Sequence, residues 1–295
     1  MPEADIEPKR FVLQTGAKNY AVHLGPARTP YVESDPRITL EPNFYYPQED
    51  ILFKYCKDHP ETTWNIICPA WIIGAVNNAA MNALHPLAVY AAVQAQKGEE
   101  LDYPGDISAW QGVCEHSTAM LTGFLSEWAA LEDKCKNQKF NASDTCPLPN
   151  NRLWPELARW YGCKDYGKPE LDESKITTID PGPKDTPLGY GPPAKPRFAW
   201  TLTQWAQREE NHKAWKEIME KKGVTHDPFE DVEAHFTFGD AAAWGLAMSL
   251  SMNKARYFGW SGHVDTLESL FLAYSELSKI GMLPPPVVDK ANPLI

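Results

Sequence analysis

The sequence has no apolar segment long enough to cross a membrane, and its charge balance is acidic. The longest apolar run, Ile66–Val76, contains Pro69 and falls short of the ~20 residues that a membrane-spanning helix needs. Lys and Arg number 28 against 39 Asp and Glu, which gives a formal net charge of −11. Nucleic-acid binding rests on cationic contacts to phosphates, so this balance argues against a nucleic-acid partner. It argues equally against docking on an anionic membrane.

The first ten residues are polar and lack the apolar stretch that is typical of a secretory signal. The six cysteines show no CxxC spacing, and in a reducing compartment we expect them to be free thiols. These features predict a soluble, cytoplasmic protein. Its 295 residues, 43% of them hydrophobic, suffice for a large core and one or two domains.

Several catalytic and metal-binding signatures are also missing. The sequence contains neither GxGxxG nor GxxGxxG, no YxxxK and no GxSxG. The absence of GxSxG argues against a serine hydrolase. Cys114 and His116 form too small a set for a zinc site, because no pair of ligands at helical spacing accompanies them. We therefore expect no metal.

The first 75 residues contain the element order of a parallel α/β sheet. Arg10–Gly16 is a short apolar run closed by glycine, and Thr62–Cys68 is a β-branched run stopped by Pro69, so both are predicted strands. Between them, Pro47–Asp58 is a predicted helix whose first residue suits a first helical turn. Strand, loop, helix and strand in this order favour a parallel sheet.

The remaining residues are predicted to be mostly helical. Lys139–Ser143 is a candidate short strand, and Asp180–Pro196, with six prolines and three glycines, is a predicted loop. The predicted helices are Ala79–Gln96, Ser117–Leu131, Leu153–Tyr161, Thr201–Lys222, Ala241–Asn253 and His263–Ile280.

Five segments, spread in order along the chain, carry a family resemblance. Together they resemble the progesterone 5-beta-reductase and iridoid synthase-like group of short-chain dehydrogenases/reductases, from about Arg10 to Pro284. LQTGxKxY and NFYYxxED are the specific motifs among them. The segments are LQTGAKNY (Leu13–Tyr20), NFYYPQED (Asn43–Asp50), Trp64–Gly74 with the following Met81-Asn82, KFNAS (Lys139–Ser143) and SMNKARYFG (Ser251–Gly259).

The resemblance implies an α/β fold that holds only part of a Rossmann-type parallel sheet. Such a reductase opens with a strand, a glycine-rich turn and a helix that hold the cofactor pyrophosphate. The comparison implies that this sequence starts just before the fifth strand of that sheet. Residues 1–75 would be the remnant of the nucleotide-binding sheet, and residues 76–295 a largely helical substrate-binding region. The exposed sheet edge would invite pairing, so we expect a possible homodimer there.

Lys18 and Tyr45 match the catalytic pair of the resembled family. Reduction of an enone or a carbonyl by hydride places negative charge on oxygen, and a phenol hydroxyl can donate a hydrogen bond or proton there. A nearby ammonium would lower the pKa of the phenol and, in relatives, holds the nicotinamide ribose. Alignment favours Tyr45 over the adjacent Tyr46, which stays an alternative. Glu49 and Asp50 are interpreted as helix-dipole and capping residues rather than an acid/base couple.

The same resemblance places the other site residues around the strand ends. Thr15 and Gly16 end one strand, and Pro69 and Ile72 follow the next, where relatives pass the nicotinamide part of NADPH. Ligands in open α/β sheets gather at these carboxyl ends. An apolar substrate binds in a pocket that is lined mainly by large hydrophobic and aromatic side chains. Trp71 and Met81 are predicted to bind the substrate, with Trp110 and Phe236–Phe238 as further candidates.

The predicted function is an NADPH-dependent reductase that acts on an activated C=C (an enone or enal) or on the carbonyl of a small apolar metabolite. A role in secondary-metabolite biosynthesis follows by analogy with the family. Two alternatives stay open, because the glycine-rich turn is missing. One is a cofactor-independent isomerase or cyclase derived from a short-chain dehydrogenase. The other is an inactive or shortened chain that folds poorly alone.

Overall fold

A three-stranded parallel sheet underlies the fold in the computed structural model, which describes residues 6–25, 27–79, 81–180, 185–191, 193, 195–245 and 248–295. Its strands β1 (Arg10–Gln14), β2 (Thr63–Pro69) and β5 (Gln138–Ala142) lie in the order β1-β2-β5. The register pairs Phe11 with Trp64 and Ile67 with Phe140. The last five residues of the central strand β2 are buried, as expected for a strand covered on both faces. The predicted α/β class with a parallel sheet is confirmed.

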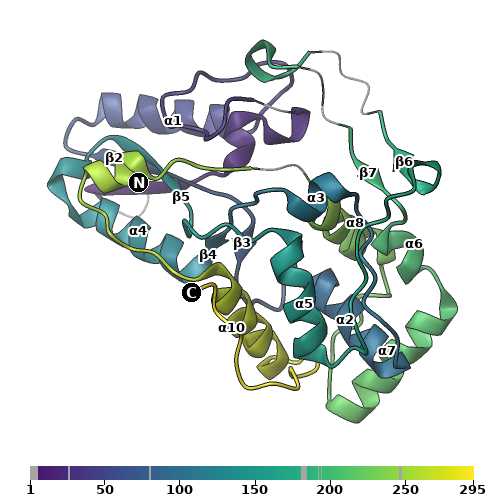
Figure 1. Ribbon diagram of the computed structural model, residues 1–295. Helices are drawn as coiled ribbons and strands as arrows, with labels where there is room; N and C mark the ends of the chain where they lie inside the picture. The colour runs from purple at the N-terminus through teal and green to yellow at the C-terminus, as the bar shows by residue number, and fades with distance from the viewer. Residues whose placement is uncertain are drawn as a thin grey trace.

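Helices cover both faces of this sheet (Figure 1). α1 (Tyr45–Asp58) packs on one face and α4 (Ala119–Leu131) on the other. α1 begins two residues before the predicted start, and Pro47 lies within its first turn, where a backbone N–H has no helical partner to lose. The start of α1 therefore faces the carboxyl ends of the strands, where it brings Tyr45 next to the end of β1.

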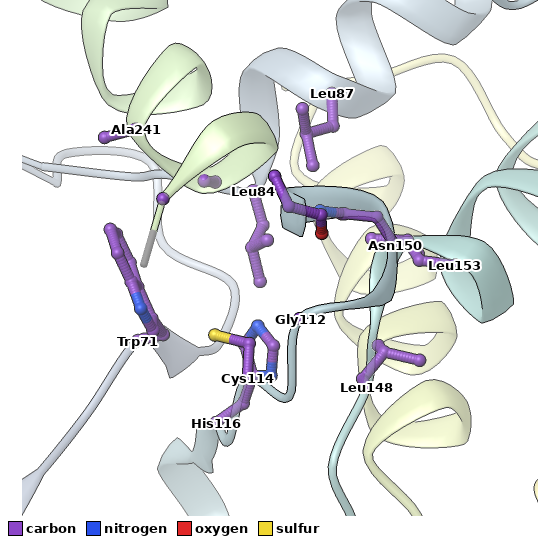
Figure 2. Close-up of a pocket in the computed structure, with 13 residues that line it drawn as sticks. Trp71, Leu84, Leu87, Gly112, Cys114, His116, Leu148, Asn150, Leu153 and Ala241 are labelled. Atoms are coloured by element: carbon purple, nitrogen blue, oxygen red, sulfur yellow. The ribbon is translucent and has the colours of Figure 1, made fainter. Parts of the chain in front are cut away.

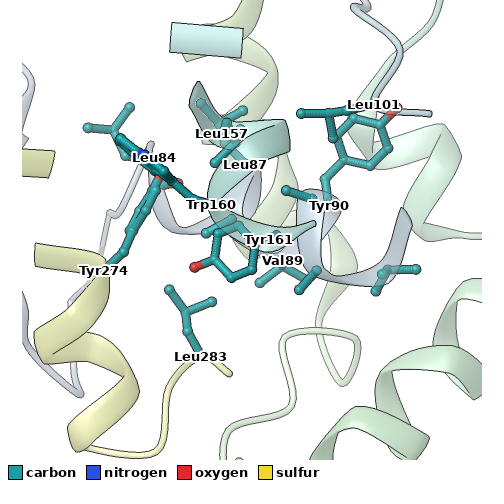
Figure 3. Packing of buried hydrophobic residues seen from close by; sticks show 14 of the residues in the cluster. Leu84, Leu87, Val89, Tyr90, Leu101, Leu157, Trp160, Tyr161, Tyr274 and Leu283 are labelled. Carbon is teal, nitrogen blue, oxygen red and sulfur yellow. The ribbon is translucent and has the colours of Figure 1, made fainter. Parts of the chain in front are cut away.

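The rest of the chain is mostly helical, as predicted, and packs around α2 (His85–Lys97). Ten consecutive residues of α2 are buried, so this helix is surrounded by other elements and lies within the largest hydrophobic core. In Figure 3, Trp160 packs against Tyr274 of that core, with ring centroids 6.0 Å apart. The other helices described here are α3 (Ile107–Gln111), α5 (Asn150–Tyr161), α6 (Leu202–Ala206), α7 (Glu209–Lys222), α8 (Val232–Trp244), α9 (Asn253–Tyr257) and α10 (Thr266–Lys279).

Short paired segments connect the sheet to the helices. β3 (Ile72–Ile73) and β4 (Ser117–Thr118) pair in parallel, and β6 (Thr177–Thr178) and β7 (Arg197–Phe198) pair antiparallel. Of the predicted loop between 180 and 196, residues 181–184, 192 and 194 lie outside the described residues. The described part holds one short 3-10 turn, Pro187–Gly189.

Three helix predictions differ from the structure. The predicted helix Thr201–Lys222 is two helices, because the chain turns at Gln207 and Arg208 between α6 and α7. The predicted helix Ala79–Gln96 begins only at His85, with a proline in its first turn. The predicted helix Ala241–Asn253 is wrong for most of its length, because α8 ends at Trp244 and the chain is extended again from Met248. Isolated parallel bridges join Met248 to Cys114 and Leu250 to Tyr31. These tertiary hydrogen bonds outweigh the local helix propensity of the segment.

β1 forms one edge of the sheet and pairs with β2 on its inner side. Pairing of this edge with a second copy of the chain stays a prediction. So does the division at residue 75, although the third strand, β5, comes from the second of the two predicted regions. In the described part of the chain, no helix combines the length and the apolar character that a bilayer crossing requires.

Candidate active site

A cavity of about 710 Å³ opens at the carboxyl ends of β1 and β2. This is where open parallel sheets bind ligands, and the volume suits a small molecule. Most of its lining side chains are apolar. The further wall candidates Trp110 and Phe236 do not line it. The cavity brings together the predicted catalytic, cofactor-binding and main substrate-binding residues, although their roles stay predictions: Thr15, Gly16, Lys18, Tyr45, Pro69, Trp71, Ile72 and Met81.

Tyr45 is the first residue of α1 and reaches from that helix to the end of β1. A β-carbon built on Gly16 would stand 2.8 Å from the Tyr45 hydroxyl oxygen, so the hydroxyl uses the space that the glycine leaves. The hydroxyl has no hydrogen-bond partner among the described residues. Burial raises the pKa of Tyr45 above its usual 10.0. The group is therefore a protonated donor at neutral pH.

Lys18 lies in the 3-10 turn η2 (Ala17–Tyr20), directly after β1. Its ammonium is 5.6 Å from the centre of the Phe44 ring, and that ring lies 4.4 Å from the ring of Tyr45. The expected lowering of the phenol pKa by Lys18 does not occur in this structure. Desolvation is the main cause of the raised pKa of Tyr45. The pKa of the exposed Glu41 is lowered, chiefly by the hydrogen bond between Glu41 and His23, and the charge of Lys18 adds to this lowering.

Asn43 connects the backbones of the two predicted catalytic residues. Its side-chain amide donates to the carbonyl of Lys18 over 2.9 Å, and its amide oxygen accepts from the backbone N–H of Tyr45 over 3.1 Å. The side chain is buried. It therefore fixes the turn after β1 relative to the start of α1. The NFYY motif contained Asn43, but nothing in the sequence spacing pointed to this bridge.

The structure separates Tyr45 from the adjacent Tyr46. The Tyr46 hydroxyl donates to the carbonyl of Asn19 over 2.9 Å and accepts from the backbone N–H of Ile38 over 2.8 Å. Its ring is buried and packs under the guanidinium of Arg37. Tyr46 is thus occupied by the protein and does not line the cavity, which favours Tyr45 as the donor.

Glu49 and Asp50 both bind Arg37, over 2.9 and 2.8 Å. Glu49 is buried and also accepts from the Asn19 amide over 2.9 Å, whereas Asp50 is exposed. Neither carboxylate lines the cavity. Both lie beyond the first turn of α1, so they hold this helix by ion pairing rather than by the helix dipole.

Thr15 turns its hydroxyl inward. The Thr15 hydroxyl lies 3.0 Å from the sulfur of Cys68 and accepts from the Asn19 amide over 3.3 Å. Cys68 is fully buried, and burial raises the pKa of its thiol, so it is neutral and shielded. This polar cluster supports the cavity floor from beneath, and Thr15 offers a ligand mainly its backbone.

The other predicted residues form the cavity rim. Ile72 and Met81 are exposed, 48% and 69% respectively, as expected for residues at an opening. Trp71 is half-buried and has a left-handed backbone, with φ of 39°, which is uncommon for a residue with a side chain. Phe238 also lines the cavity, whereas Phe236 is fully buried in the core.

Sequence reasoning missed several lining residues, among them Tyr31, Trp244 and Met248. Tyr31 lies in a proline-rich loop, Trp244 is the last residue of α8, and Met248 lies beyond that helix, in a segment predicted to be helical. No local pattern marks such positions. Among the described residues, no three His, Cys, Asp or Glu side chains gather as a metal site would need.

The sequence pattern of the PRISE-like Rossmann-fold domain matches residues 5–179. The chain belongs to this family. This confirms the predicted resemblance and the Rossmann-like fold, since the match covers the sheet and the residues around Lys18 and Tyr45.

Curated relatives of this PRISE-like chain include a fungal dehydrogenase and two plant enzymes. A short chain dehydrogenase (gsfE) of Penicillium aethiopicum is 28% identical over 94% of the chain and 69% of its own length. An (S)-8-oxocitronellyl enol synthase (ISY2) of Nepeta cataria is 31% identical over 86% of the chain and 58% of its own length. A 3-oxo-Delta(4,5)-steroid 5-beta-reductase of Arabidopsis thaliana is 30% identical over 86% and 59%.

The PRISE-like chain thus spans little more than half the length of the plant relatives and about two thirds of the fungal one. The names of these relatives bear out the predicted oxidoreductase class.

Proposed function

We propose that this protein is an NADPH-dependent reductase of a small apolar enone, enal or ketone. The observation that carries the proposal is the unpartnered hydroxyl of Tyr45 in a largely apolar cavity at the ends of two parallel strands. A half-buried phenol that is neutral at physiological pH and has no acceptor among the described residues is suited to donate to an oxygen that gains negative charge.

The chain's own residues provide the oxyanion site. As an electron pair moves onto the carbonyl oxygen of the substrate, the Tyr45 hydroxyl donates a hydrogen bond to that oxygen. The raised pKa of Tyr45 keeps the proton in place at neutral pH. Apolar side chains on the cavity wall, Phe238 and Met248 among them, exclude water and strengthen this bond. One such donor contributes roughly 10²–10³ in rate.

The nicotinamide end of NADPH fits the residues that close the strand ends. When bound, the cofactor supplies the hydride. Gly16 and Pro69 lie close together beside the Tyr45 hydroxyl, since a β-carbon on Gly16 would stand 3.5 Å from the Pro69 carbonyl oxygen. Thr15, Gly16, Pro69 and Ile72 would hold the nicotinamide here, and the ammonium of Lys18 would hold its ribose hydroxyls. The sequence offers no glycine-rich turn for the pyrophosphate, so this assignment concerns the nicotinamide end.

The names of the relatives support the substrate class. They include an enol synthase and a reductase of 3-oxo-Delta(4,5)-steroids, both of which are named for carbonyl compounds. A cavity of about 710 Å³ with few polar groups accommodates such a molecule. We infer the same class, an apolar body with a conjugated carbonyl, for this chain.

The test is oxidation of NADPH by the purified chain in the presence of enones, enals and saturated ketones, followed by absorbance, with binding of NADPH measured by calorimetry. The proposal predicts turnover of the conjugated substrates and its loss in Y45F. Binding of neither cofactor nor enone would refute it. Product formation without NADPH would instead establish the cofactor-independent isomerase or cyclase.

A further inference from the structure

A second tyrosine, Tyr31, lines the cavity of about 710 Å³ that holds Tyr45. Tyr31 is only 4% exposed, yet its hydroxyl has no hydrogen-bond partner among the described residues. The hydroxyl oxygen keeps accessible surface, because the polar side-chain atoms that are both unpartnered and fully buried in the described chain belong to other residues. Since the rest of Tyr31 is covered, this surface belongs to the cavity.

Tertiary contacts fix Tyr31 in this position. Its backbone N–H donates to the carbonyl of Ser249 over 2.9 Å, and its own carbonyl accepts from the N–H of Ser251 over 2.9 Å. The buried Asn141 amide donates to the same carbonyl over 3.1 Å. The ring stacks on that of Tyr20, with 5.3 Å between the ring centroids. The hydroxyl is therefore preorganised, and a ligand that binds it loses little free energy to the ordering of this side chain.

Two of the other polar side chains on the described cavity wall already have partners. The Thr15 hydroxyl is bonded within the protein, and His23 pairs with Glu41. Tyr31 and Tyr45, in contrast, each present an unpartnered hydroxyl to the same largely apolar cavity. A pocket with a few fixed polar groups in apolar surroundings is typical of a site that orients a small molecule.

The two hydroxyls have different anchors in the sheet. Tyr45 lies against Gly16, just after the end of β1, whereas the backbone of Tyr31 is bonded to Asn141 of β5. β2 lies between these strands, and neighbouring strands are about 4.8 Å apart, so the anchors are separated by about 10 Å. One oxygen accepts from two hydroxyls only if both lie within about 3 Å of it. The separation therefore favours a different oxygen for Tyr31.

Trp71 closes one side of this cavity. On the other side of its indole lies a separate pocket of about 30 Å³, which Leu84 and Ala241 also border (Figure 2). That volume is enough for one water-sized group and too small for part of a substrate. An extended substrate therefore lies along the strand ends, on the side of both tyrosines, rather than beyond Trp71.

The charge around Tyr31 favours an uncharged acceptor. Burial, and after it the negative charge of Asp35, raise the pKa of Tyr31 above its usual 10.0, so the phenol is protonated at neutral pH. A protonated phenol donates one hydrogen bond. The charge of Asp35 also repels a carboxylate at this position, whereas a carbonyl or ether oxygen accepts the hydrogen bond without that repulsion.

We propose that Tyr31 determines substrate specificity, because its hydroxyl donates a hydrogen bond to a second, uncharged oxygen of the substrate, remote from the carbonyl that Tyr45 binds. This role rests on the proposed function, since it places the substrate in this cavity. It narrows the substrate class to apolar enones, enals or ketones that carry a further carbonyl or ether oxygen.

The experiment compares benzylideneacetones that carry an acetyl group on the ring with analogues that carry an isopropenyl group instead. Isopropenyl has the shape of acetyl but lacks its oxygen, and the meta and para positions provide two distances between the oxygens. NMR titrations without NADPH measure the affinities. In at least one position the acetyl compound should bind roughly 3–10-fold more tightly than its isopropenyl analogue, as one neutral hydrogen bond provides. Y31F should abolish this preference.

The control is Y257F, the same substitution at a tyrosine that is 89% exposed, and it should keep the preference. Equal affinities of the acetyl and isopropenyl compounds in both positions overturn the proposal, and so does a preference that survives in Y31F. If Y31F does not fold, the crystal structure of the wild-type complex decides. The acetyl compound should then place one ketone oxygen within hydrogen-bond distance of the Tyr31 hydroxyl, and a complex without this contact overturns the proposal.

The same measurements separate this role from the reductase activity. Oxidation of NADPH together with equal affinities refutes the role of Tyr31 alone. A preference that depends on Tyr31, without oxidation of NADPH, supports the role of Tyr31 and refutes the reductase.

Discussion

The hydroxyl of Tyr45 lies where a side chain on Gly16 would be, 2.8 Å from the β-carbon position. The backbone of Gly16 is extended, with φ of −178°, so an alanine there would meet no backbone strain, and only the Tyr45 hydroxyl would have to move. We expect Gly16→Ala to displace the tip of the tyrosine at little cost in stability and to lower kcat/KM roughly 10²-fold, as an ångström-scale misplacement does.

The matched control is Gly123→Ala in α4, where a β-carbon meets no atom within 4 Å. That variant should retain full activity and gain about 1 kcal/mol of stability from helix propensity. Full activity in Gly16→Ala would show that the observed place of the Tyr45 hydroxyl is not needed.

The two adjacent tyrosines give opposite predictions. Y45F removes a hydroxyl without a partner in the described part of the chain, so stability should stay unchanged while kcat falls roughly 10²–10³-fold. Y46F removes a hydroxyl that is bonded to Asn19 and Ile38, so it should cost about 1–3 kcal/mol of unfolding free energy. Denaturant unfolding and steady-state kinetics on both variants check this, and a reversed pattern would assign the chemistry to Tyr46.

Asn43→Ala should separate positioning from folding. Without the amide that joins Lys18 to Tyr45, the two residues lose their common anchor, and kcat should fall roughly 10-fold with a smaller change in KM. Asn43→Asp keeps the acceptor for Tyr45 but loses the donor to the Lys18 carbonyl, so its kcat should lie between those of alanine and wild type. Equal kcat values for all three proteins would remove Asn43 from the mechanism.

The pH profile of the reduction follows from the pKa of Tyr45. Burial raises that pKa, so the phenol stays protonated through the whole neutral range. We expect kcat/KM with a neutral enone to show no tyrosine-dependent decline until the pH exceeds 10. A decline centred well below 10 that disappears in Y45F would mean that Lys18 acidifies the phenol after all.

Asp144 should make stability depend on pH in the opposite direction from an ordinary surface carboxylate. The Asp144 carboxylate accepts hydrogen bonds from Thr118 and Thr266, but burial raises its pKa from 3.8 to about 6. A raised folded-state pKa contributes stability below 3.8 that is lost as the pH rises through about 6, an effect of about 3 kcal/mol.

Asp144→Asn lacks this titration. Relative to wild type it should therefore gain up to about 3 kcal/mol of unfolding free energy between pH 4 and pH 7, as measured by denaturant unfolding. A constant difference between the two proteins across that range would contradict the prediction.

Local sequence patterns were sufficient to predict those strands and helices whose own residue types and spacing are typical of the element. The β-branched run of β2, the proline at the start of α1 and the apolar run of α4 follow from residue type and spacing alone. The candidate site was predictable for a different reason, because its residues belong to motifs that carry the family resemblance. Thr15, Gly16 and Pro69 also lie where β1 and β2 end, and parallel strands bring their carboxyl ends to one edge.

The sequence by itself determined the α/β class, the acidic character of the chain, and which residues gather at the strand ends. Only the tertiary structure decided which tyrosine is free, since the partners of Tyr46 lie 8 and 27 residues away along the chain. It also decided that the chain is extended again from Met248 rather than helical. Burial and long-range hydrogen bonds set these outcomes, and both depend on neighbours that local spacing does not specify.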